Sequence, residues 1–453
     1  MIQHQGAGNS IHYKIAQAVV ECRERPIAAS VEEACLAMFT NDLTCLAEAS
    51  GPETDRLDEW TRQFSQLDVA SDKSLFTTVH PESAAFSHSA RIHAFVLDST
   101  YYPSQAHFGG PTIAVGLVCA QLQGSNGEKL FRSVLAGVEI ASRIGEVLVE
   151  PTMGRGLRPT AVFGGIAAAI TASVALDFSV AETAHALALT SNFFGGTSQT
   201  WLDGSDDWVI QAGLAASNGI AVARLVRAGF NGAAAAWDGT SGLLRALGAD
   251  DGYTDRLEVA LRADSWCIED LSYKMYPACN IVQTPVKLLL EILLHTSLDD
   301  STTIVCRLNP KDAEYPGTIA AQPNCHAKAL MSVAFCLGVA LTYGGLPIEV
   351  LRSPEMHPEV SAAVARVKVI SDELVPELGA IIEVTDSTGR TIRRSLTTSA
   401  CRATWDAATV QDHARERLRS TGWTESATNS LFDTVVGLRG AETIDPLMTA
   451  LNY

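Results

Sequence analysis

The stretch Gly154-Arg155-Gly156-Leu157-Arg158-Pro159-Thr160, followed three residues later by Gly164-Gly165-Ile166-Ala167-Ala168-Ala169-Ile170, decides the fold. The first part is a glycine-broken loop that carries arginines, and the second predicts a helix with almost no side-chain bulk. Such a helix can pack with its backbone very close to its neighbours, as a buried central helix does. Its N-terminal end, with Arg158 directly ahead of it, suits an anionic ligand, because free backbone N–H groups and the helix dipole favour negative charge.

The composition is that of a large, well-buried globular protein. A chain of 453 residues is too long for one ordinary core, so two domains are expected. Hydrophobic residues make up 47% and charged residues 19%, which favours an enzyme or binding protein over a disordered chain. The net charge of -18 and the lack of a Lys/Arg run predict no nucleic-acid partner. A few buried cations can still give a pocket for an anionic small molecule.

The remaining sequence signals predict a cytoplasmic protein without metal or cofactor. Residues 1–5 lack the basic start of a secretory signal, and no apolar run reaches the ~20 residues that span a bilayer, so no membrane partner is expected. The 10 cysteines are scattered without Cys-x-x-Cys or Cys/His ligand spacing, as in a protein with reduced thiols. Gly154-x-Gly156 lacks the third glycine and the preceding strand of a dinucleotide fingerprint.

Hydrophobic periodicity predicts a mainly α fold with an inserted α+β region. Apolar residues recur at helical spacing in 31–49, 111–123, 128–149, 163–176, 181–190 and 211–228. Strands are expected at 302–308, 366–370, 381–385 and 391–396, with helices at 284–294 and 326–341 among them and a hairpin turn at 386–390. From about 404 to 451 the pattern is helical again. We therefore expect a helical domain built from residues 1–264 and 401–453, an α+β lid domain from residues 265–400, and a small-molecule site between them.

The order and spacing of several motifs resemble the MmgE/PrpD family, most strongly over residues 93–242 and detectably over most of the chain. The motifs are His93-Ala94-Phe95-Val96-Leu97-Asp98-Ser99-Thr100, Gly137-Val138-Glu139 followed by Arg143, Leu157-Arg158-Pro159-Thr160, Gly213-Leu214-Ala215-Ala216-Ser217-Asn218-Gly219, Ala228-Gly229-Phe230-Asn231-Gly232 and Lys274-Met275-Tyr276-Pro277-Ala278-Cys279. Members of this family include 2-methylcitrate dehydratase, cis-aconitate decarboxylase and iminodisuccinate epimerase. The resemblance implies a large helical domain, a smaller lid domain and a homodimer.

The positions that carry catalysis in this family match poorly. The family's Asp-x-Asp-Asp run reads Val96-Leu97-Asp98-Ser99 here, so one carboxylate is missing and another is a serine. Further acid–base or charged positions of the family fall on Arg158, Trp208, Gln211, Asn280 and Gln283, and a lid tyrosine falls on Val333. His107 and Lys274 keep their ionisable character, and Thr100 also matches. The dehydratase and decarboxylase mechanisms therefore do not transfer directly.

Three residues are the catalytic candidates. His107 lies between two expected helices and can exchange a proton with carbon next to a carbonyl, because histidine titrates near neutral pH. Lys274 can hold a carboxylate, or act as a base where burial lowers its pKa. Tyr102 can donate a hydrogen bond to a developing enolate oxygen. A helix-capping histidine, an exposed lid lysine and a packing tyrosine are the structural alternatives.

Substrate-binding residues are expected around the same cleft. Arg158 offers a planar, permanently charged fork for a carboxylate, and its structural alternative is a salt bridge to an acid such as Glu139. An apolar wall is expected at Trp208, which would suit a substrate less anionic than a tricarboxylate. The full set of expected binding residues is Arg158, Thr100, Trp208, Gln211, Tyr276, Asn280 and Gln283.

The sequence leaves three functions open. The first is a cofactor-independent lyase or isomerase of the MmgE/PrpD type, acting at carbon next to a carboxylate or carbonyl of a small organic acid. The second is a specialised-metabolism cyclase or dehydratase for a larger, less charged intermediate, where a shaped cavity contributes more than strong bases. The third is a degenerate family member that binds a small molecule without turnover.

Overall fold

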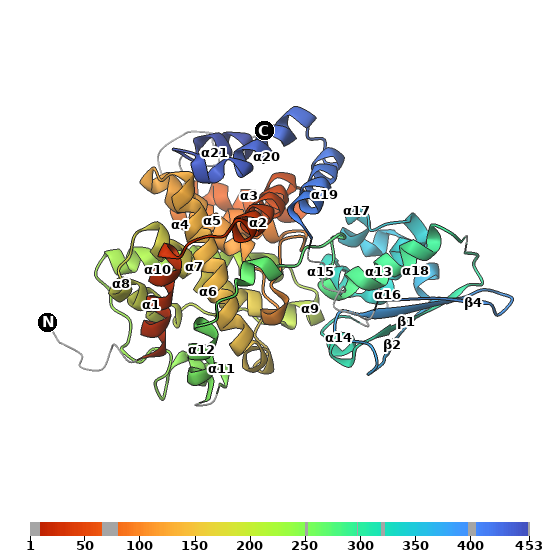
Figure 1. Cartoon of the computed structure of the whole chain (residues 1–453). Coiled ribbons are helices and arrows are strands. Elements are labelled where there is room, and N and C mark those ends of the chain that lie inside the picture. The colour runs from red at the N-terminus through yellow and green to blue at the C-terminus, as the bar shows by residue number, and fades with distance from the viewer. Residues whose placement is uncertain are drawn as a thin grey trace.

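The computed structural model describes residues 10–65, 80–249, 252–296, 298–318, 322–396 and 405–451. A large helical body carries a smaller body with a sheet on one side, and the chain passes from the first into the second and back again (Figure 1). The helices before the smaller body are α1 Ile11–Glu24, α2 Ala29–Glu48, α3 Pro52–Ser65, α4 Pro81–His93, α5 Gly109–Gln123, α6 Gly127–Gly154, α7 Pro159–Ala175, α8 Val180–Thr190, α9 Gln199–Asp203, α10 Asp207–Arg227, α11 Leu243–Leu247 and α12 Gly252–Leu261, with 3-10 turns η2 Tyr102–Ser104 and η3 Cys267–Asp270.

The Ala-rich helix α7 lies at the centre of the helical body. Nearly all of its side chains are buried, and it packs against α5, α6, α8 and α10. The approach to α6 is close enough that a methyl group at Gly137 would lie 2.0 Å from Oγ1 of Thr171. Small residues on both helices make this packing possible, as the sequence predicts. Pro159 occupies the first helical position, where its missing N–H costs no hydrogen bond, and Arg158 is the N-cap.

The smaller body, which we call the lid, is a four-stranded sheet covered by helices. Its helices are α13 Asn280–Leu293, α14 Pro310–Glu314, α15 His326–Met331, α16 Val333–Tyr343, α17 Ile348–Arg352 and α18 Pro358–Val364, with the 3-10 turn η4 Pro354–Met356. The strands are β1 Thr303–Leu308, β2 Val367–Ser371, β3 Ala380–Thr385 and β4 Thr391–Leu396, in the order β2-β1-β3-β4. β1 pairs parallel to β2 and antiparallel to β3, and β3 and β4 form the expected hairpin. The alternating burial along β1 turns Ile304, Cys306 and Leu308 toward the core beneath α13 and α16.

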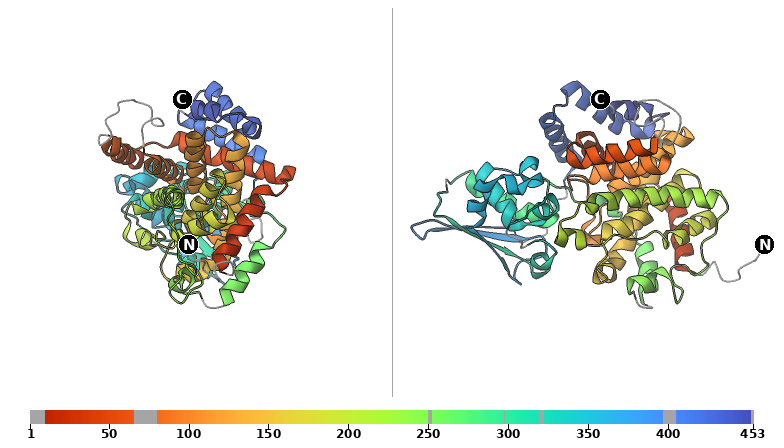
Figure 2. Two further views of the ribbon diagram at one scale, coloured as in Figure 1. Left: turned by 90° about the vertical axis from the view of Figure 1, so that its left-hand side faces the viewer. Right: turned by 180° about the vertical axis from the view of Figure 1, so that it is seen from behind.

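After the lid the chain returns to the helical body. The returning elements are α19 Ala407–Ser420, α20 Glu425–Val436, η6 Leu438–Gly440 and α21 Asp445–Leu451, and α19 lies against α2 (Figures 1 and 2). Arg417 of α19 fastens this contact, because its guanidinium donates to Glu48 and to Oδ1 of Asn41 on α2. The fold class predicted from the sequence, mainly α with a smaller α+β region, is confirmed.

Local details differ from the sequence pattern in two places. Helix α13 begins at Asn280, four residues before the predicted start, and keeps Pro285 within it. The single helix expected at 326–341 is two helices, because Ser332 ends α15 and its side chain caps α16 by accepting from the N–H of Phe335. The apolar residues at 266–268, 271 and 273 pack in the core of the helical body, and the predicted boundary at 400/401 lies outside the described residues.

Within the described part of the chain, α10 is long and apolar enough, by length and composition, to cross a membrane. Most of that stretch is buried inside the helical body, where α10 packs against α4 and α7. Burial in the core accounts for its composition.

Candidate active site

A cavity of about 450 Å³ lies between the helical body and the lid. This volume suits a small organic molecule. Helices and loops of the helical body contribute Thr100, Tyr102, His107, Arg158 and Trp201 to its wall, and the lid contributes residues 279–281, 311–312, 314–316, Met331 and Glu377. The cleft between the two bodies, where the sequence predicts the site, is therefore hollow.

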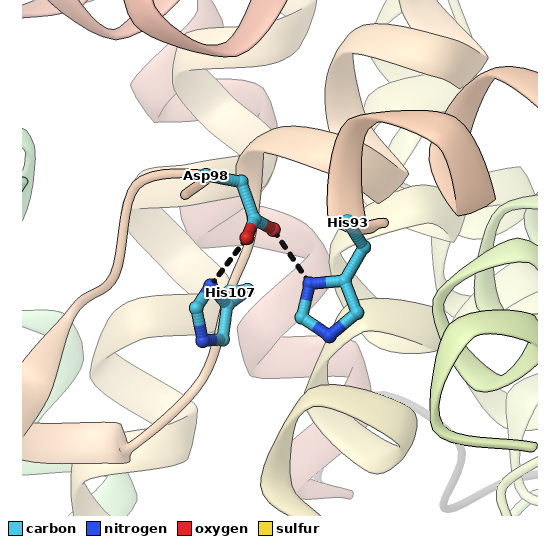
Figure 3. Close-up of side chains that lie close together, drawn as sticks. All are labelled: His93, Asp98 and His107. Atoms are coloured by element: carbon cyan, nitrogen blue, oxygen red, sulfur yellow. Dashed lines mark hydrogen bonds and ion pairs between the residues drawn. The ribbon is translucent and has the colours of Figure 1, made fainter. Parts of the chain in front are cut away.

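A buried carboxylate organises the inner end of this cavity. Asp98 lies in the loop after α4, and its two oxygens face two imidazoles from opposite sides (Figure 3). Nδ1 of His93 is 2.8 Å from Oδ2, and Nδ1 of His107 is 3.0 Å from Oδ1. Burial opposes the ionisation of Asp98, but the two histidines hold its pKa well below the usual range. Asp98 is therefore a carboxylate that fixes the orientation of both rings.

The tautomer of His93 follows from its second contact. Nη2 of Arg158 lies 2.6 Å from Nε2 of His93, and a guanidinium can only donate, so Nε2 must be the unprotonated nitrogen. Nδ1 then carries the proton that is donated to Asp98. Burial also lowers the pKa of His93, which agrees with a neutral ring. His93 thus links Asp98 to Arg158 and has no nitrogen left for a substrate.

His107 lies in the cavity wall and contacts both Asp98 and Lys274. Its Nδ1 points to Asp98, with Oγ1 of Thr100 at 3.3 Å, and its Nε2 lies 3.4 Å from Nζ of Lys274. Burial lowers the pKa of His107 to about 3, with the charge of Lys274 acting in the same direction and Asp98 opposing both. The ring is therefore neutral, and with Nδ1 directed at Asp98 its lone pair is on Nε2, beside Nζ of Lys274.

Lys274 reaches the site from the loop that precedes α13. The N–H and C=O groups of Thr100 and Ser272 are paired, which joins this loop to the one that carries Asp98. Nζ of Lys274 donates to the carbonyl of Val96 at 2.5 Å. Val96 has a φ of 54°, which is rare for a β-branched residue, so the fold holds this carbonyl in a strained position. Burial lowers the pKa of Lys274, which is 1% exposed.

Arg158 is buried without a carboxylate partner. Its Nη1 donates to the carbonyl of Trp208 at 2.8 Å and faces Gln211, and its Nη2 contacts His93. Its Cζ lies 4.9 Å from the ring centre of Trp201. No carboxylate of the described residues lies within ion-pair distance of it. The salt bridge to Glu139 that the sequence left open is absent, because Glu139 pairs with Arg143. Two of the five N–H groups of Arg158 have no acceptor within the part of the chain that the structure describes.

A second buried carboxylate holds the loop that carries Asp98. Asp42 of α2 accepts hydrogen bonds from the backbone N–H of Ser99 at 2.8 Å and from its hydroxyl at 2.6 Å. A side chain at Gly109 would collide with it, since a methyl group there would lie 1.6 Å from Oδ2 of Asp42. Burial and the nearby charge of Asp98 raise the pKa of Asp42 to about 7. Asp42 has no place in the cavity wall and acts as a support.

The structure brings six of the ten residues predicted for the site into the cavity wall, namely His107, Lys274, Tyr102, Arg158, Thr100 and Asn280. The other four lie outside it. Trp208 packs against the rings of His93 and His326 and does not form the apolar wall expected of it. Gln211 contacts Arg158 and does not reach the cavity in the way expected of a substrate-binding residue. Gln283 is bonded to the backbone at Met275, Tyr276, Ala278 and Cys279 and holds the Tyr-Pro turn together. Tyr276 takes part in that turn.

Sequence reasoning missed His93, Asp98, Trp201 and Tyr315. The spacing of His93 and Asp98 in one loop was visible, but a single sequence does not show that a second histidine meets the same carboxylate. Trp201 lies in a short helix without a motif. Tyr315 follows α14 in the lid and lies near Arg158, and burial raises its pKa to about 12. No sequence signal pointed to either aromatic residue.

His93, Asp98 and His107 are close enough together to suggest a metal site. Two imidazoles and a carboxylate are donors that divalent transition metals accept. Here, however, both Nδ1 atoms point to Asp98, and the cations of Arg158 and Lys274 stand at the other ring nitrogens. A metal ion would replace both hydrogen bonds and add charge beside two buried cations, so these residues fit a hydrogen-bonded network better than a metal site.

Comparison with known proteins identifies the family. The family model described as MmgE/PrpD N-terminal domain matches residues 13–255. No curated protein matches the chain. Because the family model covers more than half of its length, the chain belongs to the MmgE/PrpD family, as its sequence motifs indicated.

Proposed function

We propose that this member of the MmgE/PrpD family is a cofactor-independent lyase or isomerase, which removes a proton from carbon next to a carboxylate or carbonyl of a small organic acid. Membership of the family supports lyase or dehydratase chemistry in general. The observation that carries the proposal is the pair of buried cations, Arg158 and Lys274, which face one cavity beside a neutral imidazole.

The two cations provide the binding step. A buried charge without a counterion is costly, and here neither cation has a carboxylate partner among the described residues. A substrate carboxylate between them supplies the missing countercharge. It can accept from the two unpaired N–H groups of Arg158 and from the ammonium of Lys274, both charge-assisted hydrogen bonds.

His107 provides the proton-transfer step. His107 lines the cavity, and Asp98 holds its Nδ1 and so fixes the orientation of the ring. The base is Nε2, which becomes available when a bound carboxylate draws the ammonium of Lys274 away from it. Part of the lowering of its pKa comes from Lys274, so a bound carboxylate that neutralises Lys274 raises the pKa of His107. Substrate binding thereby makes the imidazole a stronger base when the substrate carbon is in place.

Hydrogen-bond donors face the charge that forms on the substrate. Removing a proton next to a carboxylate or carbonyl leaves an enolate oxygen, which the ammonium of Lys274 stabilises. The raised pKa of Tyr315 keeps its phenol protonated at neutral pH, so the lid offers a second donor. His107, Lys274 and Arg158 are all less than 9% exposed, so little water competes for these interactions.

Deuterium exchange tests this function directly. The protein is incubated in D₂O with a panel of small mono-, di- and tricarboxylates and their unsaturated analogues, and NMR follows loss of the C–H signal next to the carboxylate. We expect exchange with at least one acid and a loss of about 10²–10⁴-fold in His107→Asn. The matched control is His326→Asn, which changes a buried histidine outside the cavity wall and should keep the rate. Equal exchange in wild type and His107→Asn would refute the assignment, and no exchange with any acid would favour a binding role.

A further inference from the structure

We propose that the substrate is a monocarboxylate whose far end is uncharged or cationic, and not a di- or tricarboxylate. This inference rests on the proposed function, because it concerns the same cavity. It follows from the distribution of charge between the buried inner end and the exposed rim of that cavity.

The inner end has room for one negative charge. Arg158 and Lys274 each carry a positive charge there, and Asp98 carries a negative one, so a single carboxylate completes the balance. All three side chains are less than 5% exposed, so water does little to screen them. A second carboxylate at this end would leave excess negative charge in a buried place.

The middle of the cavity is largely apolar. Val96 and Trp201 of the helical body face Ile281 and Met331 of the lid across it. The indole Nε1–H of Trp201 is buried and has no acceptor within the described ranges, so a neutral oxygen of the substrate can satisfy it. These walls suit a hydrocarbon body with at most a carbonyl or hydroxyl group.

The rim of the cavity is acidic. Three exposed or half-buried carboxylates line it, Glu150, Glu314 and Glu377, against one cation, Lys311, and the buried Asp312 adds a fourth carboxylate to the same wall. That lysine is already paired, since its Nζ lies 2.6 Å from Glu377. Burial raises the pKa of Asp312 to about 6, which leaves it mostly ionised at neutral pH. A substrate that reaches from the inner cations to this rim therefore meets net negative charge, which repels a second carboxylate and attracts an ammonium group.

A matched set of simple acids tests the inference without knowledge of the natural substrate. Isothermal titration calorimetry compares acids of equal length with three different ends: butyrate, 4-aminobutyrate and succinate, and then hexanoate, 6-aminohexanoate and adipate. We expect the monocarboxylates to bind at least about tenfold more tightly than the dicarboxylate of the same length. Tighter binding of the amino acids than of the plain acids indicates a cationic far end, and equal binding indicates an uncharged one. Either result supports the proposal.

Two variants show where the discrimination arises. The double variant Glu150→Lys/Glu314→Lys changes exposed rim residues and should bring adipate to the affinity of hexanoate. Arg158→Gln should weaken all the acids of a series equally, because it removes a contact they share. Dicarboxylates that bind wild type as tightly as monocarboxylates, or no binding by any acid, would overturn the proposal. The proposed function fails separately, if a bound acid shows no exchange that depends on His107.

Discussion

Two largely buried clusters, each with a carboxylate, histidine and arginine, contact the ring of Trp208, and they differ in whether their charges are paired. The Asp98 cluster consists of His93, Asp98, His107, Arg158 and Lys274, and the Glu53 cluster consists of Glu53, His326 and Arg352. The ring of Trp208 is 5.7 Å from that of His93 and 5.8 Å from that of His326. Both clusters combine a carboxylate with histidine and arginine, so the arrangement of charge is what distinguishes them.

The charges of the Glu53 cluster are paired within the protein, and the pairs join the two bodies. Glu53 of α3 faces Nδ1 of His326 on α15 at 3.0 Å and Nε of Arg352 on α17 at 3.3 Å. Arg352 also donates to the carbonyl of Ser50 and lies over the ring of Phe95. Burial opposes the ionisation of Glu53, but its contacts with His326 and Arg352 lower its pKa. Every charge has its partner, as expected of an element that holds the lid in place.

The charges of the Asp98 cluster are not balanced by its own residues. It has two cations for one carboxylate, and that carboxylate contacts histidines and neither cation. The comparison teaches that burial of charged groups alone is weak evidence of a site. A buried cation that lacks a counterion within its own protein is stronger evidence, because folding tolerates that cost where binding later offsets it.

Exchanging the two arginines for glutamine gives the largest expected effect. Arg158→Gln should lower the rate of substrate C–H exchange about 10²–10³-fold, because a buried charge-assisted contact to the carboxylate is lost. Its free energy of unfolding should change by less than about 1 kcal/mol, since removal of an unpaired buried cation offsets the lost hydrogen bonds. Arg352→Gln should do the opposite, with about 3 kcal/mol lost in denaturant unfolding and exchange by the folded protein retained. If Arg158→Gln mainly destabilises the fold, the distinction between the clusters is wrong.

Replacing the carboxylate of each cluster, Asp98 or Glu53, by its amide should give a smaller effect than replacing the arginines. Asn at position 98 offers one acceptor and one donor, so it cannot accept from both His93 and His107. Asp98→Asn should therefore lower kcat for exchange about 10²-fold with little change in KM, as expected of a positioning residue. Glu53→Gln should cost about 2 kcal/mol of stability and leave kcat unchanged. Steady-state exchange kinetics measure kcat and KM of both variants, and urea unfolding measures their stability. A raised KM with unchanged kcat in Asp98→Asn would contradict the positioning role.

The smallest expected effect is a pH dependence of the Asp98 cluster. Burial lowers the pKa of Lys274, and carboxylate binding needs its ammonium form. Affinity for a monocarboxylate should thus fall about tenfold per pH unit above this lowered pKa, at a pH below the usual range of lysine. The folding stability of the ligand-free protein has the opposite pH dependence. Between the lowered pKa of Lys274 and the pKa of lysine in the unfolded chain, the unfolded state binds more protons, so the contribution of Lys274 to stability rises with pH. Calorimetric titrations from pH 7 to 10 check this, and Lys274→Met should remove the dependence.

Much of the fold was predictable because its signals are local. Helical periodicity marked α2, α5, α6, α7, α8 and α10. Alternation marked β1 and β2, and the hairpin turn marked β3 and β4, all to within one residue at each end. The split at Ser332 escaped prediction, because a serine within an apolar run reads equally as a helical residue or as a cap. The early start of α13 was not predicted, because a proline such as Pro285 is more common in the first turn of a helix than in its interior.

The sequence by itself determined the kinds of group that this protein can use. A small-residue central helix, Arg158 ahead of it, His107 between two helices and Lys274 before the lid were all readable from local pattern and family resemblance. Only the tertiary structure decided which of them meet: it brings Lys274 to the carbonyl of Val96 and to His107, and it places Arg158 on His93. The tertiary structure also places Trp208 and Gln211 outside the cavity wall, where the sequence had predicted binding residues. The reason is physical, since local propensity fixes the direction of a helix, whereas contacts across the core depend on how whole elements pack.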